Sequence, residues 1–165
     1  MDWLQAAREC CPREWAIGAG ALRNLVWDRL TGRCNPPVDV DVAYFGGAGE
    51  SEVEGCLRNR LPSVRWQAKD QALVHTWYER TFGYSVEPLT SLADAIATWP
   101  ETCTSVAVRL RSDGGLDVFA PCGLEDLFGL VLRRNPRRVT VERFRRRLAE
   151  KRITERWPGV TVVDG

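Results

Sequence analysis

Apolar residues recur along this chain with two different periods, one of three to four residues and one of two residues, and segments of the two kinds alternate along its length. Leucine and valine recur at a spacing of three to four between residues 20 and 31, which predicts a helix that ends at Gly32. Valine and aspartate then alternate strictly from Val38, which predicts a strand over 38–45. The chain therefore interleaves helical and strand patterns.

The same criteria predict most of the remaining elements. Further helices are predicted over about residues 2–10, 50–60, 70–79, 91–98, 123–132 and 139–156, and further strands over about residues 14–17, 64–68, 104–111, 116–120 and 160–163. Ser51 and Glu54 have the spacing of a capping pair for the helix at 50–60. Because strands and helices interleave, we expect an α/β (α+β) fold, a mixed sheet flanked by helices, formed by residues 1–165 as one domain.

Composition and cysteine spacing exclude several classes of protein. With 44% apolar residues among 165 the chain is able to form a core, and no apolar run approaches the roughly 18 residues of a membrane span. The first ten residues, with Arg8 and Glu9, lack the pattern of a signal peptide. The six cysteines show no C-x-x-C spacing and lie far from His75, so we expect reduced thiols, no zinc site and a cytoplasmic protein without a membrane partner.

Two carboxylates are predicted to share one face of the strand at 38–45. Asp39 and Asp41 are two residues apart, so their side chains leave the same face and their Cα atoms lie about 7 Å apart. Carboxylates this close repel one another unless a cation joins them, and oxygen ligands suit Mg²⁺. A solvated strand edge shows the same pattern, so both interpretations stand at this point.

A turn that suits phosphate precedes this strand. The strand at 14–17 enters Gly18-Ala19-Gly20, where a helix begins and its first N–H groups are free to bind an anion. Arg23, one turn into the helix, would add a charge-assisted contact. The alternatives are an ordinary strand-to-helix connection and a solvated arginine. Together with Asp39 and Asp41, the turn predicts a site for phosphoryl or nucleotidyl transfer.

Several segments resemble a known family. I-G-A-G-A-L-R-N-x-V-W-D, followed by D-V-D-V-A-Y-F, resembles the nucleotidyltransferase fold of the DNA polymerase β superfamily, and above all its small bacterial branch of unknown substrate. Agreement extends to K-D-Q-A-L-V-H-T-W at 69–77, W-P-E-T at 99–102 and L-D-V-F-A-P-C-G-L-E-D-L-F at 116–128. The turn reads G-A-G-A where the superfamily has G-G or G-S, and its interval to D-x-D is longer than in the polymerases.

The resemblance implies a reaction and the residues that perform it. A metal-dependent nucleotidyltransferase moves a nucleoside monophosphate from an NTP to an acceptor hydroxyl, with two Mg²⁺ ions, and releases pyrophosphate. Gly18, Ala19 and Gly20 would hold the nucleotide phosphates, and Asp39 and Asp41 would hold the metal. Asp117 would be the third carboxylate, which joins them in the metal site and assists deprotonation of the acceptor. The acceptor would be a small molecule, a protein side chain or an RNA end.

The role of Asp117 depends on the hairpin that carries it. If Asp113-Gly114-Gly115 forms a three-residue loop, Arg111 faces Asp117, whereas a two-residue loop places Ser112 there. An ion pair with an arginine is then the alternative to catalysis. Two interpretations also remain open for three polar residues of the next helix region, Lys69, Gln71 and His75. They either line a substrate pocket or form a half-buried polar face.

Charge is distributed unevenly although the net charge is only +1. Residues 131–165 hold 11 Lys or Arg against four Asp or Glu, and the remainder is acidic. The basic helix predicted at about 139–156 either binds tRNA, another polyanion or the triphosphate, or packs on the acidic remainder and neutralises it.

Two other functions compete with nucleotidyl transfer. G-A-G-A-L-R begins like the dinucleotide-binding G-x-G-x-x-G, but Arg23 takes the place of the third glycine, which argues against that class. A non-catalytic nucleotide-binding or protein-interaction module on the same fold is the remaining alternative.

Overall fold

Residues 1–35 and 39–164, the part of the chain that the computed structural model describes, form a five-stranded and a two-stranded sheet. The strands are β1 (Trp15–Gly18), β2 (Val40–Tyr44), β3 (Trp66–Asp70), β4 (Ala107–Leu110), β5 (Leu116–Phe119), β6 (Val131–Arg133) and β7 (Thr161–Val163). The larger sheet has the order β3-β2-β1-β4-β5, in which only β2 and β3 are parallel. The prediction of a mixed sheet flanked by helices is confirmed.

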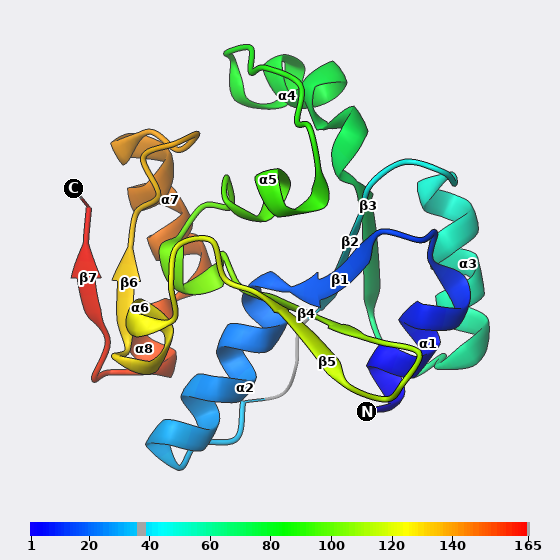
Figure 1. Ribbon diagram of the computed structural model, residues 1–165. Coiled ribbons are helices and arrows are strands. Elements are labelled where there is room, and N and C mark those ends of the chain that lie inside the picture. The colour runs from blue at the N-terminus through cyan, green and yellow to red at the C-terminus, as the bar shows by residue number, and fades with distance from the viewer. Residues whose placement is uncertain (36–38, 165) are drawn as a thin grey trace.

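The helices surround this sheet (Figure 1). They are α1 (Asp2–Cys10), α2 (Ala19–Thr31), α3 (Glu50–Arg60), α4 (Val74–Phe82), α5 (Leu92–Ile96), α6 (Glu125–Phe128), α7 (Val141–Lys151) and α8 (Ile153–Arg156), with short 3₁₀ turns at Gln71–Leu73 and Thr102–Thr104. Most predicted helices are confirmed within a few residues. The helix predicted at 70–79 begins instead as a 3₁₀ turn, and α4 follows it.

Strict alternation on β2 separates core from site. Val40 and Val42 are buried in a cluster that α1 and α3 cover, so the predicted burial of the valine face is confirmed for these two residues; Val38 lies outside the described residues. The opposite face of the sheet carries small residues, Ala16, Ala43 and Ala107, on which α5 packs. Because alternate residues leave opposite faces, Asp39 and Asp41 are on this second face.

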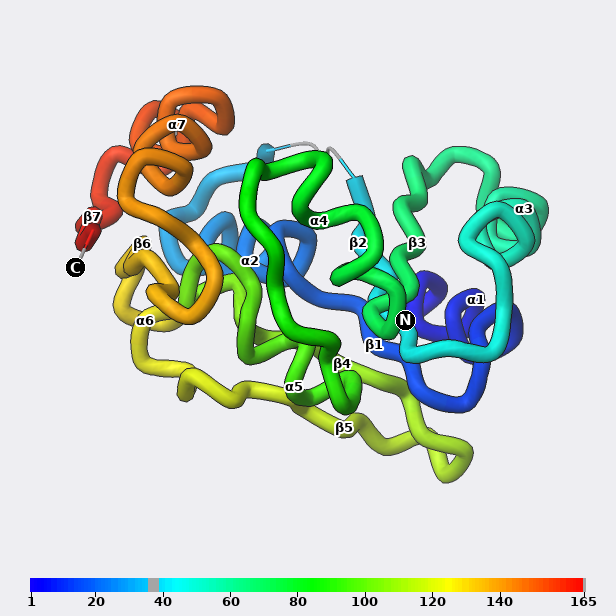
Figure 2. Tube along the Cα trace, turned by 90° about the horizontal axis from the view of Figure 1, so that it is seen from above, coloured from blue at the N-terminus to red at the C-terminus, as the bar shows by residue number. Residues whose placement is uncertain are grey.

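The C-terminal elements form a separate buried cluster around α2. Trp27 of α2 packs edge to face against Trp157, with ring centroids 5.5 Å apart, and Phe144 of α7 and Ile153 of α8 join them. Figures 1 and 2 show these elements at the opposite end of the molecule from α1 and α3. The basic helix is therefore attached to the fold by its apolar stripe, which leaves its arginines at the surface.

Two of the predicted helices are wrong in extent. The helix at 123–132 is reduced to the single turn of α6, because Leu130 adopts a left-handed conformation after Gly129 and the chain continues as β6. β6 then pairs in parallel with β7. The helix at 139–156 breaks at Arg152, which is also left-handed, with φ of 49°. Neither break is marked by proline, the residue that most clearly ends a helix in sequence.

Two local predictions on α3 are also wrong. Gly49, not Ser51, is the N-cap, and Glu54 accepts a hydrogen bond from the Ala68 amide instead of closing a capping box. Cys10 of α1 and Cys56 of α3 form a disulfide, so these two are not reduced thiols. The disulfide and the Glu54 contact both tie α3 to neighbouring elements.

The other four cysteines are not in disulfides, and the lengths of the helices bear on whether the chain crosses a membrane. Within the described residues, Cys11, Cys34, Cys103 and Cys122 are free thiols, and burial raises the pKa of Cys11 and Cys103 to about 12, which keeps both protonated. Among the same residues, none of the helices is long and apolar enough to cross a membrane.

Candidate active site

A cleft of about 940 Å³ separates the second face of the sheet from the C-terminal helices. Its walls come from the start of α2, from β2 and β3, from the segment 99–104, and from α7 and α8. The cleft is thus formed by segments that are distant in sequence, and each predicted site residue can be placed relative to it.

Asp39 and Asp41 both line the cleft. Asp41 is paired in register with Gly18 of β1, so the carboxylates lie next to the glycine turn. Arg65 forms an exposed ion pair with Asp39, with Nε and Oδ1 3.3 Å apart. Burial raises the pKa of Asp41 to about 6, and the neighbouring charge of Asp39 adds to the effect. Burial and Asp39 together outweigh the nearby positive charges at Asp41, and a bound cation would relieve this cost of ionising it.

Asp39 and Asp41 suit magnesium, but they supply only two ligands. Asp39 and Asp41 offer carboxylate oxygens, which Mg²⁺ prefers, and Mg²⁺ commonly binds one or two carboxylates together with water and phosphate oxygens. Across residues 1–35 and 39–164, no three His, Cys, Asp or Glu side chains converge in a way that could hold a metal ion. The predicted set of three carboxylates is not assembled.

Asp117 lies outside the cleft because of the strand order. The row of paired residues through Asp41 crosses Gly18 and Ala107 and reaches β5 at Phe119, two residues beyond Asp117. Three strand spacings of about 4.8 Å place Asp117 roughly 14 Å or more from Asp41. The structure does not bring the predicted third carboxylate to the metal-binding pair.

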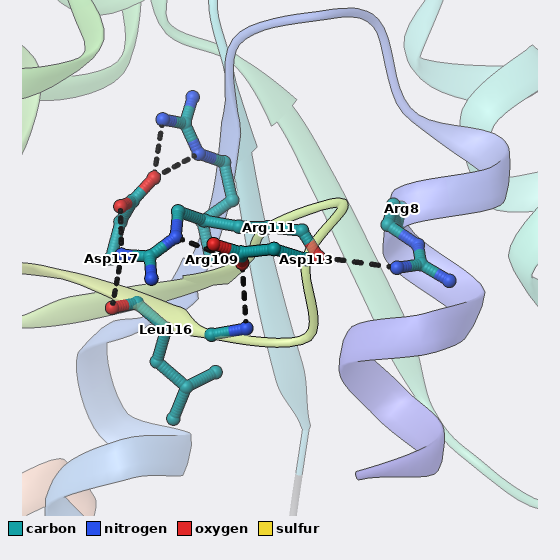
Figure 3. Close-up of polar contacts among 7 residues, drawn as sticks. Arg8, Arg109, Arg111, Asp113, Leu116 and Asp117 are labelled. Carbon is teal, nitrogen blue, oxygen red and sulfur yellow. Dashed lines mark hydrogen bonds and ion pairs between the residues drawn. The ribbon is translucent and has the colours of Figure 1, made fainter.

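The carboxylate of Asp117 instead forms ion pairs with two arginines (Figure 3). Arg109 lies directly opposite and donates from Nε and Nη2 to Oδ2, at 3.0 and 2.6 Å, and Arg111 donates to Oδ1 at 3.3 Å. Hydrogen bonds from Arg109 above all hold the pKa of Asp117 below its usual range. Neither predicted register is right: Gly115 pairs with Arg111, and Arg109 faces Asp117. The arginine pairing considered as the alternative role is confirmed.

The two glycines of the turn have different roles. A Cβ on Gly18 would lie 2.5 Å from the Val106 carbonyl oxygen and 2.6 Å from the Ala107 Cβ, so only glycine allows this close approach of strands. A Cβ on Gly20, which lines the cleft, would meet nothing within 4 Å. Ala19 has φ of 53°, and its N–H donates to the Val106 carbonyl at 3.2 Å. Only part of the predicted phosphate turn is therefore open to a ligand.

Arg23 lines the cleft and does not lie on a solvated face of α2. Its side chain is almost fully buried, with the guanidinium carbon 4.7 Å from the Trp27 ring centroid and 5.2 Å from that of Trp157. Burial lowers the pKa of Arg23 from its ordinary value. The guanidinium therefore packs against both aromatic rings, which leaves little of it free to contact an anion in the cleft.

The predicted substrate pocket is assembled only in part. Lys69 and Gln71 line the cleft, and Lys69 donates to Glu50 at 2.7 Å. His75 does not line it, and its buried Nδ1 has no hydrogen-bond partner among the described residues. Gln71 belongs to the 3₁₀ turn that precedes α4, whereas His75 lies in α4 itself.

Sequence reasoning missed the residues that close the cleft opposite β2. Glu101, which is 6% exposed, accepts hydrogen bonds from Arg147 Nε at 3.0 Å and from the Thr104 hydroxyl at 2.9 Å. Arg147 and Lys151 both line the cleft from α7. Their spacing of four places both on one helical face, which is the signal in the sequence that could have found them.

The cleft thus holds a carboxylate pair at the start of a strand, a strand-to-helix turn and basic side chains, an arrangement that suits phosphate-containing ligands. The chain belongs to a nucleotidyltransferase family, whose profile matches residues 5–162. The resemblance noted from the sequence is thereby confirmed, with the fold it implied. No curated protein matches the chain.

Solved structures share the fold. An NMR structure described as a CCA-adding enzyme head domain is 26% identical, with a TM-score of 0.79, over 97% of this chain and 86% of that chain. A CCA-adding enzyme solved with CTP is 15% identical, with a TM-score of 0.53, over 98% of this chain and 43% of that one. A tRNA-processing enzyme in an apo form is 20% identical, with a TM-score of 0.55, over 97% and 41%. The chain spans less than half the length of these last two.

Proposed function

We propose that the protein transfers a nucleoside monophosphate from a nucleoside triphosphate to an acceptor hydroxyl and releases pyrophosphate. The observation that carries the proposal is the placement of Asp39 and Asp41 side by side on the wall of a large cleft with basic side chains opposite. Family membership supports the reaction class, and the CTP complex of a CCA-adding enzyme supports a nucleotide as ligand. The acceptor is a small molecule, a protein side chain or an RNA end, and a cytoplasmic location stays a prediction.

The roles of the residues follow from their placement. Asp39 and Asp41 would hold magnesium, which supplies positive charge to the reacting phosphate oxygens when bound. Gly20 leaves room for a phosphate to approach the backbone at the start of α2. Since Asp117 lies outside the cleft, the proton of the acceptor hydroxyl would pass to a carboxylate of the pair on β2. Rate enhancement would then come from positioning and charge neutralisation.

A second candidate is a nucleotide-binding module that performs no transfer. The observation that favours it is the lack, among the described residues, of a third carboxylate beside Asp39 and Asp41. Both candidates predict binding of the magnesium–nucleotide complex, but only the first predicts release of pyrophosphate.

Calorimetric titration with each of the four nucleoside triphosphates, with and without Mg²⁺, tests the shared step. We expect magnesium-dependent binding that Asp39→Ala/Asp41→Ala abolishes, and equal binding by wild type and variant would refute the site. A screen for pyrophosphate release over hydroxyl-bearing acceptors then separates transfer from binding alone. Transfer of label from an α-labelled nucleotide to the acceptor, absent in the double variant, would establish the reaction.

A further inference from the structure

The larger sheet ends in two edge strands, β3 and β5, whose outer backbone groups differ in their surroundings. On β3, the Ala68 amide donates to Glu54 of α3 at 3.0 Å. The Asp70 amide donates in the same way to Glu50 of α3, at 3.1 Å. Proteins commonly cover an edge strand, because its free backbone groups can pair with another chain. Helix α3 protects the β3 edge in this way, whereas β5 lies along the periphery of the molecule and pairs, among the described strands, with β4 alone (Figure 2).

The hairpin between β4 and β5 determines which backbone groups of β5 point outward. The Arg111 amide donates to the Gly115 carbonyl at 2.8 Å, so these two residues form a hydrogen-bonded pair next to the turn. Hydrogen-bonded and non-hydrogen-bonded pairs alternate along an antiparallel ladder, so the N–H and C=O groups of Leu116 and Val118 point away from β4. Arg111 Nη1 reaches the Leu116 carbonyl at 3.4 Å, but within residues 1–35 and 39–164 the outward groups of Val118 form no hydrogen bond.

Leu116 and Val118 also expose apolar side chains. They are 46% and 57% exposed, although Leu110, which is opposite Leu116, is buried in the cluster that α1 and α3 cover. These helices therefore cover their face of the sheet as far as β4 and leave β5 open, and Figure 3 shows the Leu116 side chain pointing away from the arginine ion pairs. Leu124 and Phe128, just after β5, are exposed as well. Free backbone groups beside exposed apolar side chains are typical of an interaction surface.

We propose that two copies of this chain associate through β5, which pairs antiparallel with the partner's β5 about a two-fold axis at Val118. The two five-stranded sheets then form one continuous sheet. In this register Val118 is opposite the partner's Val118, and Leu116 is opposite the partner's Ala120. The alternative axis at Asp117 would place two carboxylates directly opposite one another, which is unfavourable.

Charges at the two ends of β5 favour a second copy of this chain over an unrelated peptide. Arg8 of α1 lies beside the turn end of β5, where its Nη1 donates to the Arg111 carbonyl at 3.2 Å, and Glu125 begins α6 just after the other end. Within the described residues, neither Arg8 nor Glu125 forms an ion pair. Antiparallel pairing brings the turn end of one β5 to the α6 end of the other, so the two charges meet twice in the dimer and fix its orientation.

The size of this interface predicts a weak dimer. β5 has four residues, and Pro121, which has no N–H, limits extension of the strand pair beyond Ala120. Stable interfaces bury about 1,600 Å² in total, so Leu124 and Phe128 would have to be covered as well. We expect a dissociation constant on the order of 10–100 µM. Because no residue of β5 lines the cleft, the dimer leaves the cleft open, and the proposal does not depend on the reaction proposed above.

Sedimentation velocity over a range of protein concentrations tests the association. We expect a monomer–dimer equilibrium, which Val118→Lys should weaken at least about tenfold, because two lysines would face one another at the axis. Val162→Lys is the matched control, since Val162 is an exposed valine on β7, in the smaller sheet. A wild type that stays monomeric well above the expected dissociation constant would overturn the proposal and leave β5 to an extended segment of another protein. Equal weakening by the two lysine variants would also overturn it. Unfolding curves verify that each variant is folded.

A disulfide across the axis tests the register. The Cα atoms of a hydrogen-bonded antiparallel pair are about 5.5 Å apart, a separation that a disulfide spans. Val118→Cys should therefore form covalent dimers in oxidised glutathione, in a Cys34→Ser/Cys122→Ser background that removes an exposed thiol and a thiol close to β5. Leu116→Cys is the matched control, because it is opposite the partner's Ala120 and should form few. Equal crosslinking at the two positions would refute the axis at Val118.

Exchange of the two end charges tests the antiparallel orientation. Arg8→Glu and Glu125→Arg should each weaken the dimer severalfold, because like charges then meet at both ends of the strand pair. The double variant restores opposite charges and should recover most of the wild-type affinity, which a purely local effect of either substitution would not produce. A double variant that dimerises no better than the single variants would overturn the pairing of these ends.

Discussion

Arg147 Nε donates a hydrogen bond to Glu101 Oε1 at 3.0 Å, and this contact joins the C-terminal helix to the segment that leads into β4. The two residues are 46 positions apart in sequence. Glu101 also accepts from the Thr104 hydroxyl, so one buried carboxylate fixes both a local turn and a distant helix. The wall of the cleft opposite Asp39 and Asp41 depends on this contact.

Replacing Glu101 by alanine should lower the free energy of unfolding by about 1–3 kcal/mol, because Arg147 and Thr104 lose a charged acceptor in a buried place. Glu101→Gln retains an acceptor oxygen and should lose less. Urea unfolding measures both. Glu155→Ala is the control, since its ion pair with Arg152 is largely exposed and should leave stability unchanged. Similar losses for Glu101→Ala and Glu155→Ala would show that the buried contact contributes nothing.

The two glycines of the turn should respond in opposite ways to alanine. Gly18→Ala forces a Cβ against the Val106 carbonyl and should cost about 3 kcal/mol or more, with a lower Tm. Gly20→Ala meets no neighbour and should leave stability equal or raise it by up to about 1 kcal/mol, since alanine favours helix. Binding of the magnesium–nucleotide should nevertheless weaken in Gly20→Ala if phosphate approaches the backbone there. Thermal unfolding and calorimetry of the two variants decide both points.

Periodicity was sufficient to predict most of the elements and the placement of the valine and aspartate faces of β2. The alternation of Val40, Asp41 and Val42 places the aspartate on the opposite face of the strand from the two valines, whatever the rest of the fold. Tertiary context decided what periodicity could not. Leu130 and Arg152 adopt left-handed conformations that no local pattern marks, and these convert one predicted helix into a turn and a strand and break another.

The candidate site could be predicted only where its residues are close in sequence. Asp39 and Asp41 are two apart, so one strand suffices to bring them together. Asp117 could be placed only with the strand order and hairpin register known, and both put it beside Arg109 and away from the cleft. The contact of Glu101 with Arg147 joins two segments that no local pattern connects.

Asp117→Asn should leave magnesium–nucleotide binding within about twofold of wild type at physiological salt, because charges roughly 14 Å apart are largely screened. Asp41→Asn, which removes a proposed ligand, should weaken the same binding at least about tenfold. Calorimetric titration of both variants makes the comparison direct. A loss in Asp117→Asn as large as that in Asp41→Asn would return Asp117 to the site.

The raised pKa of Asp41 makes a signed prediction about stability in metal-free buffer. In the unfolded chain an aspartate titrates near about 3.9, whereas burial and Asp39 raise the folded pKa of Asp41 to about 6. Between these values the folded protein binds the extra proton, so this group adds stability as pH falls and is destabilising when ionised. Asp41→Asn should therefore be more stable than wild type at pH 7.5, by about 1–2 kcal/mol, and the difference should shrink toward pH 5.

Magnesium supplies the matched test of the same charge. A cation bound by ionised Asp39 and Asp41 relieves their repulsion, so Mg²⁺ should raise the free energy of unfolding of wild type at pH 7.5 and much less at pH 5. Asp39→Asn/Asp41→Asn should show no response to Mg²⁺ at either pH. Urea unfolding at the two pH values, with EDTA or with Mg²⁺, measures the free energy of unfolding of wild type and of each variant. The contrary result is a difference in the free energy of unfolding between wild type and Asp41→Asn that is the same at pH 5 and pH 7.5. That result would mean that Asp41 titrates normally, and that the two carboxylates do not repel one another enough to favour a bound cation.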